Sequence, residues 1–182
     1  VERLDIKKKV FEAIAPFVAE HAVVTTNTSG RLLWDLITHR VAIYSPHTAF
    51  DSTVRGINQR LAEGMGLHEI RPLVAIEGAA EGAGGGRVGR LEPAQSLSNV
   101  AERLQAFLSI DHIQFVGDLH RSIDRVAVAC GAAGEFLAAA QQANCDLLVL
   151  GETNLLTCLE AEASDVALLL PGHFASERFA VE

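Results

Sequence analysis

Three apolar segments in the last third of the chain constrain its fold more than any other feature. They read RVAVAC, DLLVLG and VALLLP, and each is followed by a stretch with helical character: EFLAAAQQAN, TCLEAEAS and GHFASERF. Strands this uniformly apolar are buried on both faces, which requires a parallel or mixed sheet covered by helices. The alternation therefore predicts an α/β fold, with mixed sheets, helices on the outer faces and right-handed crossovers.

The earlier part of the chain fits the same class. Its pattern predicts helices over 31–38 and 47–67, a strand at VAIYS, a glycine-rich loop over 76–91, and a helix after Pro93 capped by Ser96 or Ser98. With 182 residues, 49% of them hydrophobic, the chain can bury a substantial core. We expect a single domain over 1–182, with 1–90 and 91–182 as possible lobes.

Charge and cysteine content narrow the functional classes. The net charge of −8 repels phosphate backbones, so nucleic acid is not an expected partner, and a small anionic ligand would need a metal to offset the protein's charge. Three cysteines in apolar segments favour reduced, buried thiols over a disulfide framework. The sequence shows neither an apolar run of about 20 residues nor a signal-peptide core. We therefore expect a soluble, cytoplasmic protein without a membrane partner.

Two similar motifs carry the strongest chemical signal. His47 precedes Asp51 by four residues, His173 precedes Glu177 by four, and both histidines follow a predicted strand and a proline. On a helix, residues i and i+4 share a face, so each motif presents an imidazole beside a carboxylate. Two such faces together would suit Zn, Fe, Mn, Co or Ni, in a catalytic rather than a structural site. A helix cap or a surface ion pair explains either motif equally simply.

Two further groups follow predicted strands. Glu152 ends the DLLVLG strand, where it could act as a base, orient a metal-bound histidine, or complement a helix N-terminus. The Cys130-Gly-Ala-Ala-Gly134 turn has the glycine content of a phosphate loop but lacks the Lys-Ser/Thr of such loops, which favours a tight strand–helix turn. We expect the Cys130 thiol to belong to the core.

Several of these segments, in this order, resemble the bacterial Nif-three-like family of dinuclear-metal proteins, the type-two GTP cyclohydrolase I homologues. They are YSPHTAFDS, GINQRLAEGMGL, QFVGD, RVAVACGAAGEFL, LLVLGE and GHFASERFAVE, and the resemblance runs from about Thr26 to Glu182. It implies an α/β fold of two similar halves, assembled as a toroidal homohexamer. It also implies metal binding by Asp51, His173 and Glu177, with Glu177 bridging two ions and His47 beside them.

The chain departs from the family pattern at three places. The adjacent histidine pair expected upstream of His47 is absent, and Leu156 stands where the family usually carries a histidine. The sequence also stops at AVE, where relatives continue with another helix. We therefore expect one or two divalent metal ions per subunit, with a site that is depleted relative to the family.

The resemblance implies a metal-dependent hydrolase-like protein. In that interpretation the metal would activate water for attack on a small nucleotide or heterocyclic substrate, and Glu152 would transfer the proton. The alternative function is a non-catalytic metal-binding protein or an oligomeric scaffold, which the missing histidines favour. A structural remnant that keeps only its assembly is a third possibility.

Overall fold

The computed structural model describes residues 23–25, 42–44 and 48–178 of the chain, which divides into two compact units, 1–47 and 48–182. In the first unit, β1 (Val23–Thr25) pairs in parallel with β2 (Ala42–Tyr44), so the strand predicted at VAIYS is confirmed. The helix predicted over 31–38 and the residue His47 lie outside the described residues. The lobes 1–90 and 91–182 stay a prediction.

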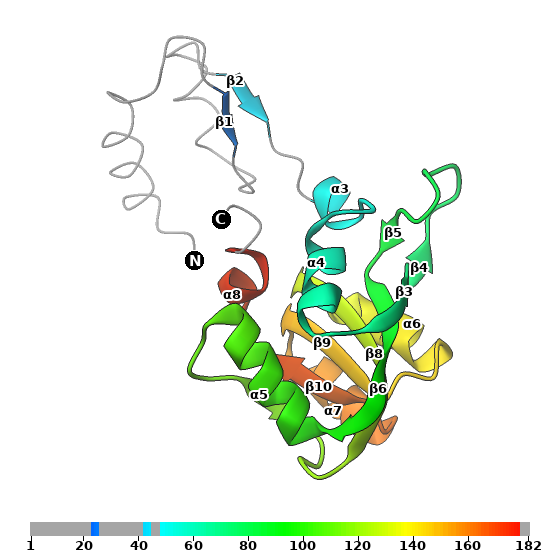
Figure 1. Ribbon diagram of the computed structural model, residues 1–182, viewed down its shortest axis with the longest axis vertical. Helices are drawn as coiled ribbons and strands as arrows, with labels where there is room; N and C mark the ends of the chain where they lie inside the picture. Colours follow the sequence, from blue (N-terminus) through cyan, green and yellow to red (C-terminus); the bar gives the residue numbers. More distant parts are fainter. Residues whose placement is uncertain (1–22, 26–41, 45–47, 179–182) are drawn as a thin grey trace. The chain divides into compact units, whose positions relative to one another are not determined.

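Six described strands of the second unit form one mixed sheet (Figure 1), in the order β3-β6-β8-β9-β10-β7. The strands β8, β9 and β10 are mutually parallel, whereas β3, β6 and β7 run antiparallel to their neighbours. This confirms the three predicted apolar strands and the mixed sheet. Their bounds are β3 (His68–Arg71), β6 (Arg87–Ser96), β7 (Gln114–Val116), β8 (Ser122–Ala132), β9 (Leu147–Glu152) and β10 (Ala167–Leu170).

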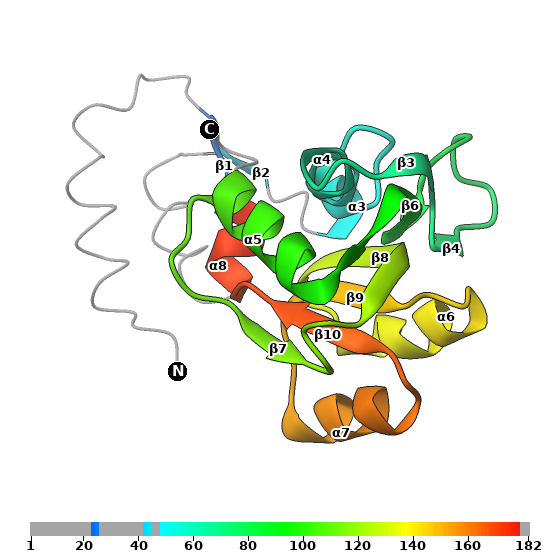
Figure 2. The same cartoon turned by 60° about the horizontal axis from the view of Figure 1, so that its bottom comes forward.

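Helices cover both faces of this sheet, as Figure 2 shows. The helices α4 (Ile57–Gly64) and α5 (Leu97–Leu108) lie on one face, and α6 (Leu137–Gln142) and α7 (Leu155–Ala163) lie on the other. Two short helices, α3 (Thr48–Asp51) and α8 (His173–Glu177), and a 3-10 turn (Gly134–Phe136) complete the described helices. The predicted α/β class is confirmed. Among residues 23–25, 42–44 and 48–178, no helix is long and apolar enough to cross a membrane.

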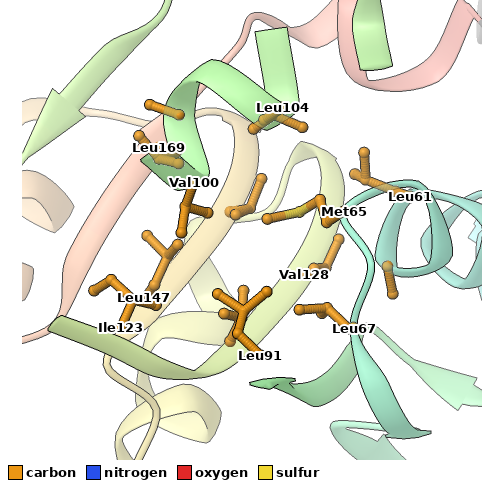
Figure 3. Packing of buried hydrophobic residues seen from close by; sticks show 14 of the residues in the cluster. Leu61, Met65, Leu67, Leu91, Val100, Leu104, Ile123, Val128, Leu147 and Leu169 are labelled. Atoms are coloured by element: carbon orange, nitrogen blue, oxygen red, sulfur yellow. The ribbon is translucent and has the colours of Figure 1, made fainter. Parts of the chain in front are cut away.

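Successive residues of the central strands point into different cores. Val126, Val128, Leu147 and Val149 pack with α4 and α5, and the residues between them pack with α6 and α7. Figure 3 shows the first of these clusters, where Leu104 and Met65 lie over Val128 and Leu147. Burying a leucine side chain contributes about 1.5–3 kcal/mol. The apolar strands that the sequence displays are therefore explained by burial on both faces.

Three boundaries differ from the sequence-based expectation. The predicted loop over 76–91 contains strand β5 (Gly84–Gly85), which pairs with β4 (Val74–Ala75) just before the loop, and from Arg87 onward the segment is strand β6. The helix expected after Pro93 begins at Leu97, with the predicted cap Ser96 accepting a hydrogen bond from the Asn99 amide. The helix expected over 47–67 is broken into α3 and α4. At Gly56, between them, an added Cβ would lie 1.9 Å from the Phe50 carbonyl oxygen.

Candidate metal site

The polar side chains of interest gather at the carboxyl ends of the parallel strands. β8 ends at Ala132, β9 ends at Glu152, and α8 begins at His173, three residues after the end of β10. A backbone hydrogen bond of 2.9 Å from the Gly172 amide to the Gly151 carbonyl fastens the start of α8 to β9. Ligand sites of open α/β sheets lie at this edge. Topology alone therefore brings Glu152 and His173 together.

The His173 imidazole lies between two carboxylates. Its Nδ1 is 2.9 Å from Oε1 of Glu152, and its Nε2 is 3.3 Å from Oε1 of Glu177, one turn later on α8. The hydrogen bond to Glu152 raises the pKa of His173, partial burial opposes this, and the charges of Glu177 and Asp51 raise it further. In the protonated form both ring nitrogens donate to carboxylates. In the neutral form, Nδ1–H can donate to Glu152 and leave the Nε2 lone pair facing Glu177.

Asp51 approaches the same region from α3. Its carboxylate belongs to the surroundings of the Cys130 thiol on β8, and so does that of Glu177. Burial, the charges of Asp51 and Glu177 and a hydrogen bond to Asp51 together raise the pKa of Cys130 far above its usual range. The thiol is thus neutral and buried, as expected for a core residue. The charges of Asp51 and Glu177 therefore act on two groups, the Cys130 thiol and the His173 imidazole.

Gly131 makes room for the two donors of α8. Its φ of +71° lies in the left-handed region that favours glycine, and an added Cβ would lie 2.6 Å from Oε1 of Glu177 and 3.4 Å from Nε2 of His173. The backbone of β8 therefore passes directly beside the imidazole and the carboxylate. A larger residue at this position would displace Glu177.

Not every predicted ligand can be placed. His47 lies outside the described residues, and Leu156, in the position expected for a histidine, is a 76% exposed side chain on α7. Within the described ranges, no group of three or more His, Cys, Asp or Glu side chains is arranged to hold a metal ion. The described part of the site is therefore a His–Glu pair, a carboxylate on its far nitrogen, and Asp51 nearby. The predictions of Asp51, His173, Glu177 and His47 as ligands, and of Glu152 as a proton carrier, stay predictions.

Two buried polar residues at this edge were missed from the sequence. Asn58 on α4 is 4% exposed and Ser176 on α8 is 0% exposed. Asn58 occupies the same helical face as the buried Leu61 and Ala62, three and four residues later. A polar residue on an apolar helical face was the signal that could have identified it. Ser176 lies inside the His173–Glu177 motif, and a serine between two charged residues gives no sequence signal of burial.

Two cavities lie at opposite ends of the sheet, and one of them adjoins the carboxyl ends of the parallel strands. One of about 360 Å³ lies beside Glu152 and is lined by Ala132, Gly134, Glu135, Glu152, Thr153, Asn154 and Thr157. A larger one of about 510 Å³ lies at the opposite end of the sheet, where Arg121 pairs with Asp165 at 2.7 Å. The larger cavity contains none of the predicted site residues. Of these two cavities, the smaller one lies beside Glu152, the hydrogen-bond partner of His173.

Comparison with known protein families identifies the family to which this chain belongs. The family model described as Duf34/NIF3 (NGG1p interacting factor 3) matches residues 16–182, nearly the whole chain. The chain belongs to the Duf34/NIF3 family. The resemblance seen in the sequence motifs is therefore confirmed.

Curated relatives of this NIF3-family chain carry two kinds of name. NIF3-like protein 1 of Drosophila melanogaster is 33% identical over 158 residues, which cover 86% of this chain and 53% of the relative. A GTP cyclohydrolase 1 type 2 homolog of Clostridium acetobutylicum is 27% identical over 148 residues, covering 81% and 55%. The chain thus spans about half the length of these relatives.

Solved structures agree on the fold. A Bacillus cereus protein related to NIF3 superposes with a TM-score of 0.78 at 15% identity, covering 92% of this chain and 76% of the other. The protein ybgI, of unknown function, gives 0.75 at 19% identity, covering 96% and 72%. At these identities the likeness concerns the fold alone. It supports a NIF3-like α/β architecture for the mixed sheet.

Proposed function

We propose that this NIF3-family protein binds a divalent transition metal through Asp51, His173 and Glu177. The observation that carries the proposal is the position of the His173 imidazole between Glu152 and Glu177. Two ligands of one ion, each about 2.0–2.2 Å from it at a tetrahedral angle, are about 3.3–3.6 Å apart. Nε2 of His173 and Oε1 of Glu177 are 3.3 Å apart, which fits such a pair of donors.

Glu152 completes this arrangement from the opposite side of the ring. A carboxylate on Nδ1 holds the imidazole in one tautomer and one orientation, so that the Nε2 lone pair is directed at the ion. The 2.9 Å contact between Nδ1 and Oε1 supports this role for Glu152. A plain His–carboxylate ion pair would need neither a second carboxylate on the far nitrogen nor a glycine that clears space beside both donors.

For the chemistry we propose a hydrolase-like reaction on a small nucleotide or heterocyclic substrate. When bound, a divalent metal would supply Lewis acidity and activation of water. The carboxylates of Asp51 and Glu177 would balance its charge in an acidic protein. We assign the proton transfer to Glu152, and its exposure and its contact with His173 support this role.

The 360 Å³ cavity beside Glu152 favours a polar substrate. Thr153, Asn154 and Thr157 offer hydroxyl and amide groups, and Glu135 and Glu152 add two carboxylates. These groups match the donors and acceptors of a heterocyclic base. None of the lining residues is cationic, so a phosphate group would depend on the metal for its counter-charge.

Metal binding is tested by titrating chelator-stripped protein with Co²⁺ and recording calorimetric heat and ligand-field absorption. We expect the wild type to bind, and both His173→Ala and Glu177→Ala to lose most of the affinity. The matched controls are His120→Ala and Glu102→Ala, which change an exposed histidine just before the amino end of β8 and an exposed glutamate in the middle of α5. Absence of binding by the wild type, or equal binding by all four variants, would overturn the proposal.

Catalysis is a separate question with its own test. Metal-loaded protein is incubated with a panel of nucleotides and free heterocycles, with Asp51→Ala and Glu152→Gln as controls. Turnover that both substitutions abolish supports the hydrolase. Tight metal binding without turnover across the panel supports the non-catalytic alternative instead.

A metal-binding scaffold is the second candidate, and one observation favours it. Helix α7 exposes three leucines and α8 exposes Phe174: Leu155 is 71% exposed, Leu156 76%, Leu159 51% and Phe174 75%. Such side chains are typical of surfaces that another protein covers, and the homohexamer implied by the family would provide one. Light scattering during size-exclusion chromatography measures the mass. A hexamer that Leu156→Ser with Leu159→Ser disperses supports the scaffold, whereas a monomeric wild type contradicts it.

A further inference from the structure

The last residues of β8 leave the regular sheet. In the pairing of β8 with β9 the register shifts between Ala129 and Ala132, so Cys130 and Gly131 fall inside the irregularity. On the other side, the register with β6 extends on β8 only to Val128. Gly131 has a φ of +71°. Buried amides at such a bulge must find partners other than the ladder.

Asn58 supplies the partner for the first amide. Its Oδ1 accepts a 2.7 Å hydrogen bond from the Cys130 amide, and its Nδ2 donates a 3.1 Å bond to the Asp51 backbone carbonyl. The two bonds fix the orientation of the side-chain amide. If it were flipped, its NH₂ group would face the Cys130 N–H and its oxygen would face the Asp51 carbonyl oxygen. One buried side chain thus links the end of β8 to the end of α3.

Ser176 supplies the partner for the second amide. Its Oγ accepts a 3.0 Å hydrogen bond from the Gly131 amide and donates a 2.8 Å bond to the His173 carbonyl. Ser176 is fully buried, and Gly151 leaves the space for it, since an added Cβ there would lie 2.6 Å from the hydroxyl. The hydroxyl therefore fixes α8, which carries His173 and Glu177, against β8.

We propose that Asn58 and Ser176 are the positioning residues of the metal site. Asn58 binds the Cys130 amide and Ser176 binds the next amide, that of Gly131. Asp51 on one side, and His173 with Glu177 on the other, are therefore held against the same two residues of β8. Packing alone would allow α3 and α8 to shift independently by fractions of an ångström, whereas hydrogen bonds to one shared peptide set their separation. This inference rests on the proposed metal-binding function.

The experiment compares Asn58→Leu and Ser176→Ala with Leu104→Ala, a control from the fully buried core of α5. Unfolding by urea measures stability, and Co²⁺ titration measures affinity and the ligand-field spectrum. We expect both site variants to bind Co²⁺ about 10- to 100-fold more weakly, with altered spectra. The control loses comparable stability but keeps wild-type affinity. Wild-type affinity in both site variants, or an equal loss in the control, would overturn the proposal.

A second readout does not require metal. In metal-free protein, nuclear magnetic resonance follows the Asp51 carboxyl carbon and the His173 ring nitrogens. We expect Asn58→Leu to move the Asp51 signal and leave His173 in place, and Ser176→Ala to do the reverse. If the wild type binds no Co²⁺, the proposed function fails, and these shifts still decide the positioning: unchanged signals in both variants overturn it.

Should Asn58→Leu not fold, Asn58→Asp takes its place. The aspartate keeps an acceptor for the Cys130 amide but loses the donor to the Asp51 carbonyl. We expect it to move the Asp51 signal while the Cys130 amide remains protected from hydrogen exchange. An unmoved Asp51 signal in this variant would contradict the role of Asn58.

Discussion

The middle and the end of strand β8 are held in different ways. From Val126 to Ala129 the backbone is paired with β9, up to Val128 it is also paired with β6, and successive side chains enter two separate cores. At Cys130 and Gly131 the register breaks, and the amides bind Asn58 and Ser176 instead. One strand thus contains a region stabilised by many similar contacts and a region that depends on two side chains and a glycine.

The difference concerns redundancy. In the middle, removing one side chain leaves the ladder and the neighbouring apolar contacts in place, so the structure weakens without changing shape. At the end, each hydrogen bond has its own donor and acceptor, and losing one moves a functional group. We therefore expect substitutions in the middle to reduce stability most, and substitutions at the end to reduce metal affinity most.

The largest loss of stability is expected for Leu148→Ala, in the strand beside the middle of β8. Leu148 is fully buried, and such a truncation costs about 2–5 kcal/mol, because it removes apolar contacts and leaves a cavity. Urea unfolding measures the change, with Leu148→Met as the matched control, which should cost less than about 1.5 kcal/mol. Under conditions where the variant remains folded, Co²⁺ affinity should equal that of the wild type. A large drop in affinity would show that the middle of the sheet also sets the site.

Arg87 comes next, because its guanidinium is buried among oxygen acceptors. It donates to the Thr53, Gly84 and Gly86 carbonyls and to the Gln59 side chain, at 2.6 to 2.9 Å. Burial lowers the pKa of Arg87 somewhat. Arg87→Met leaves these acceptors without their donor, and we expect a loss of about 2–3 kcal/mol in urea unfolding. The exposed Arg55→Met serves as the control and should change stability by less than about 0.5 kcal/mol.

Gly131→Ala should reduce stability less than Leu148→Ala or Arg87→Met does, but it should reduce metal affinity more. A non-glycine residue in the left-handed region costs about 1–2 kcal/mol, and here the new methyl group would also press on Glu177. Gly78→Ala is a matched control, since Gly78 has a φ of +76° and an added Cβ there would meet no described atom within 4 Å. Both variants should lose similar stability, whereas only Gly131→Ala should lose Co²⁺ affinity. Equal affinity in the two variants would remove Gly131 from the site.

The same contrast explains how far the sequence could be interpreted. The middle of the sheet was predictable because burial on both faces leaves a visible mark, the apolar runs around Val128, Val149 and Leu169. The His173–Glu177 pair was predictable because helical spacing brings the two residues together. The apolar helical face around Asn58 could reveal that Asn58 is buried, but not what it binds. The partners of Asn58 and Ser176 are backbone amides 72 and 45 residues away along the chain, and a backbone amide carries no sequence signal. Strand β6 was hidden by glycines that suggested a loop.

The smallest effect is expected from the titration of His173 in metal-free protein. Its pKa is raised in the folded state, first by the hydrogen bond to Glu152. A raised pKa means that the contribution is fully present below the unfolded value of about 6.5 and is lost as the pH rises through the folded value. Because His173 and Glu152 are about half exposed, the contribution should not exceed about 1 kcal/mol. Urea unfolding of the wild type and His173→Gln should therefore differ more at pH 5.5 than at pH 9. A difference that stays constant with pH would mean that folding leaves the pKa of His173 unshifted, and a difference that grows with pH would mean that folding lowers it.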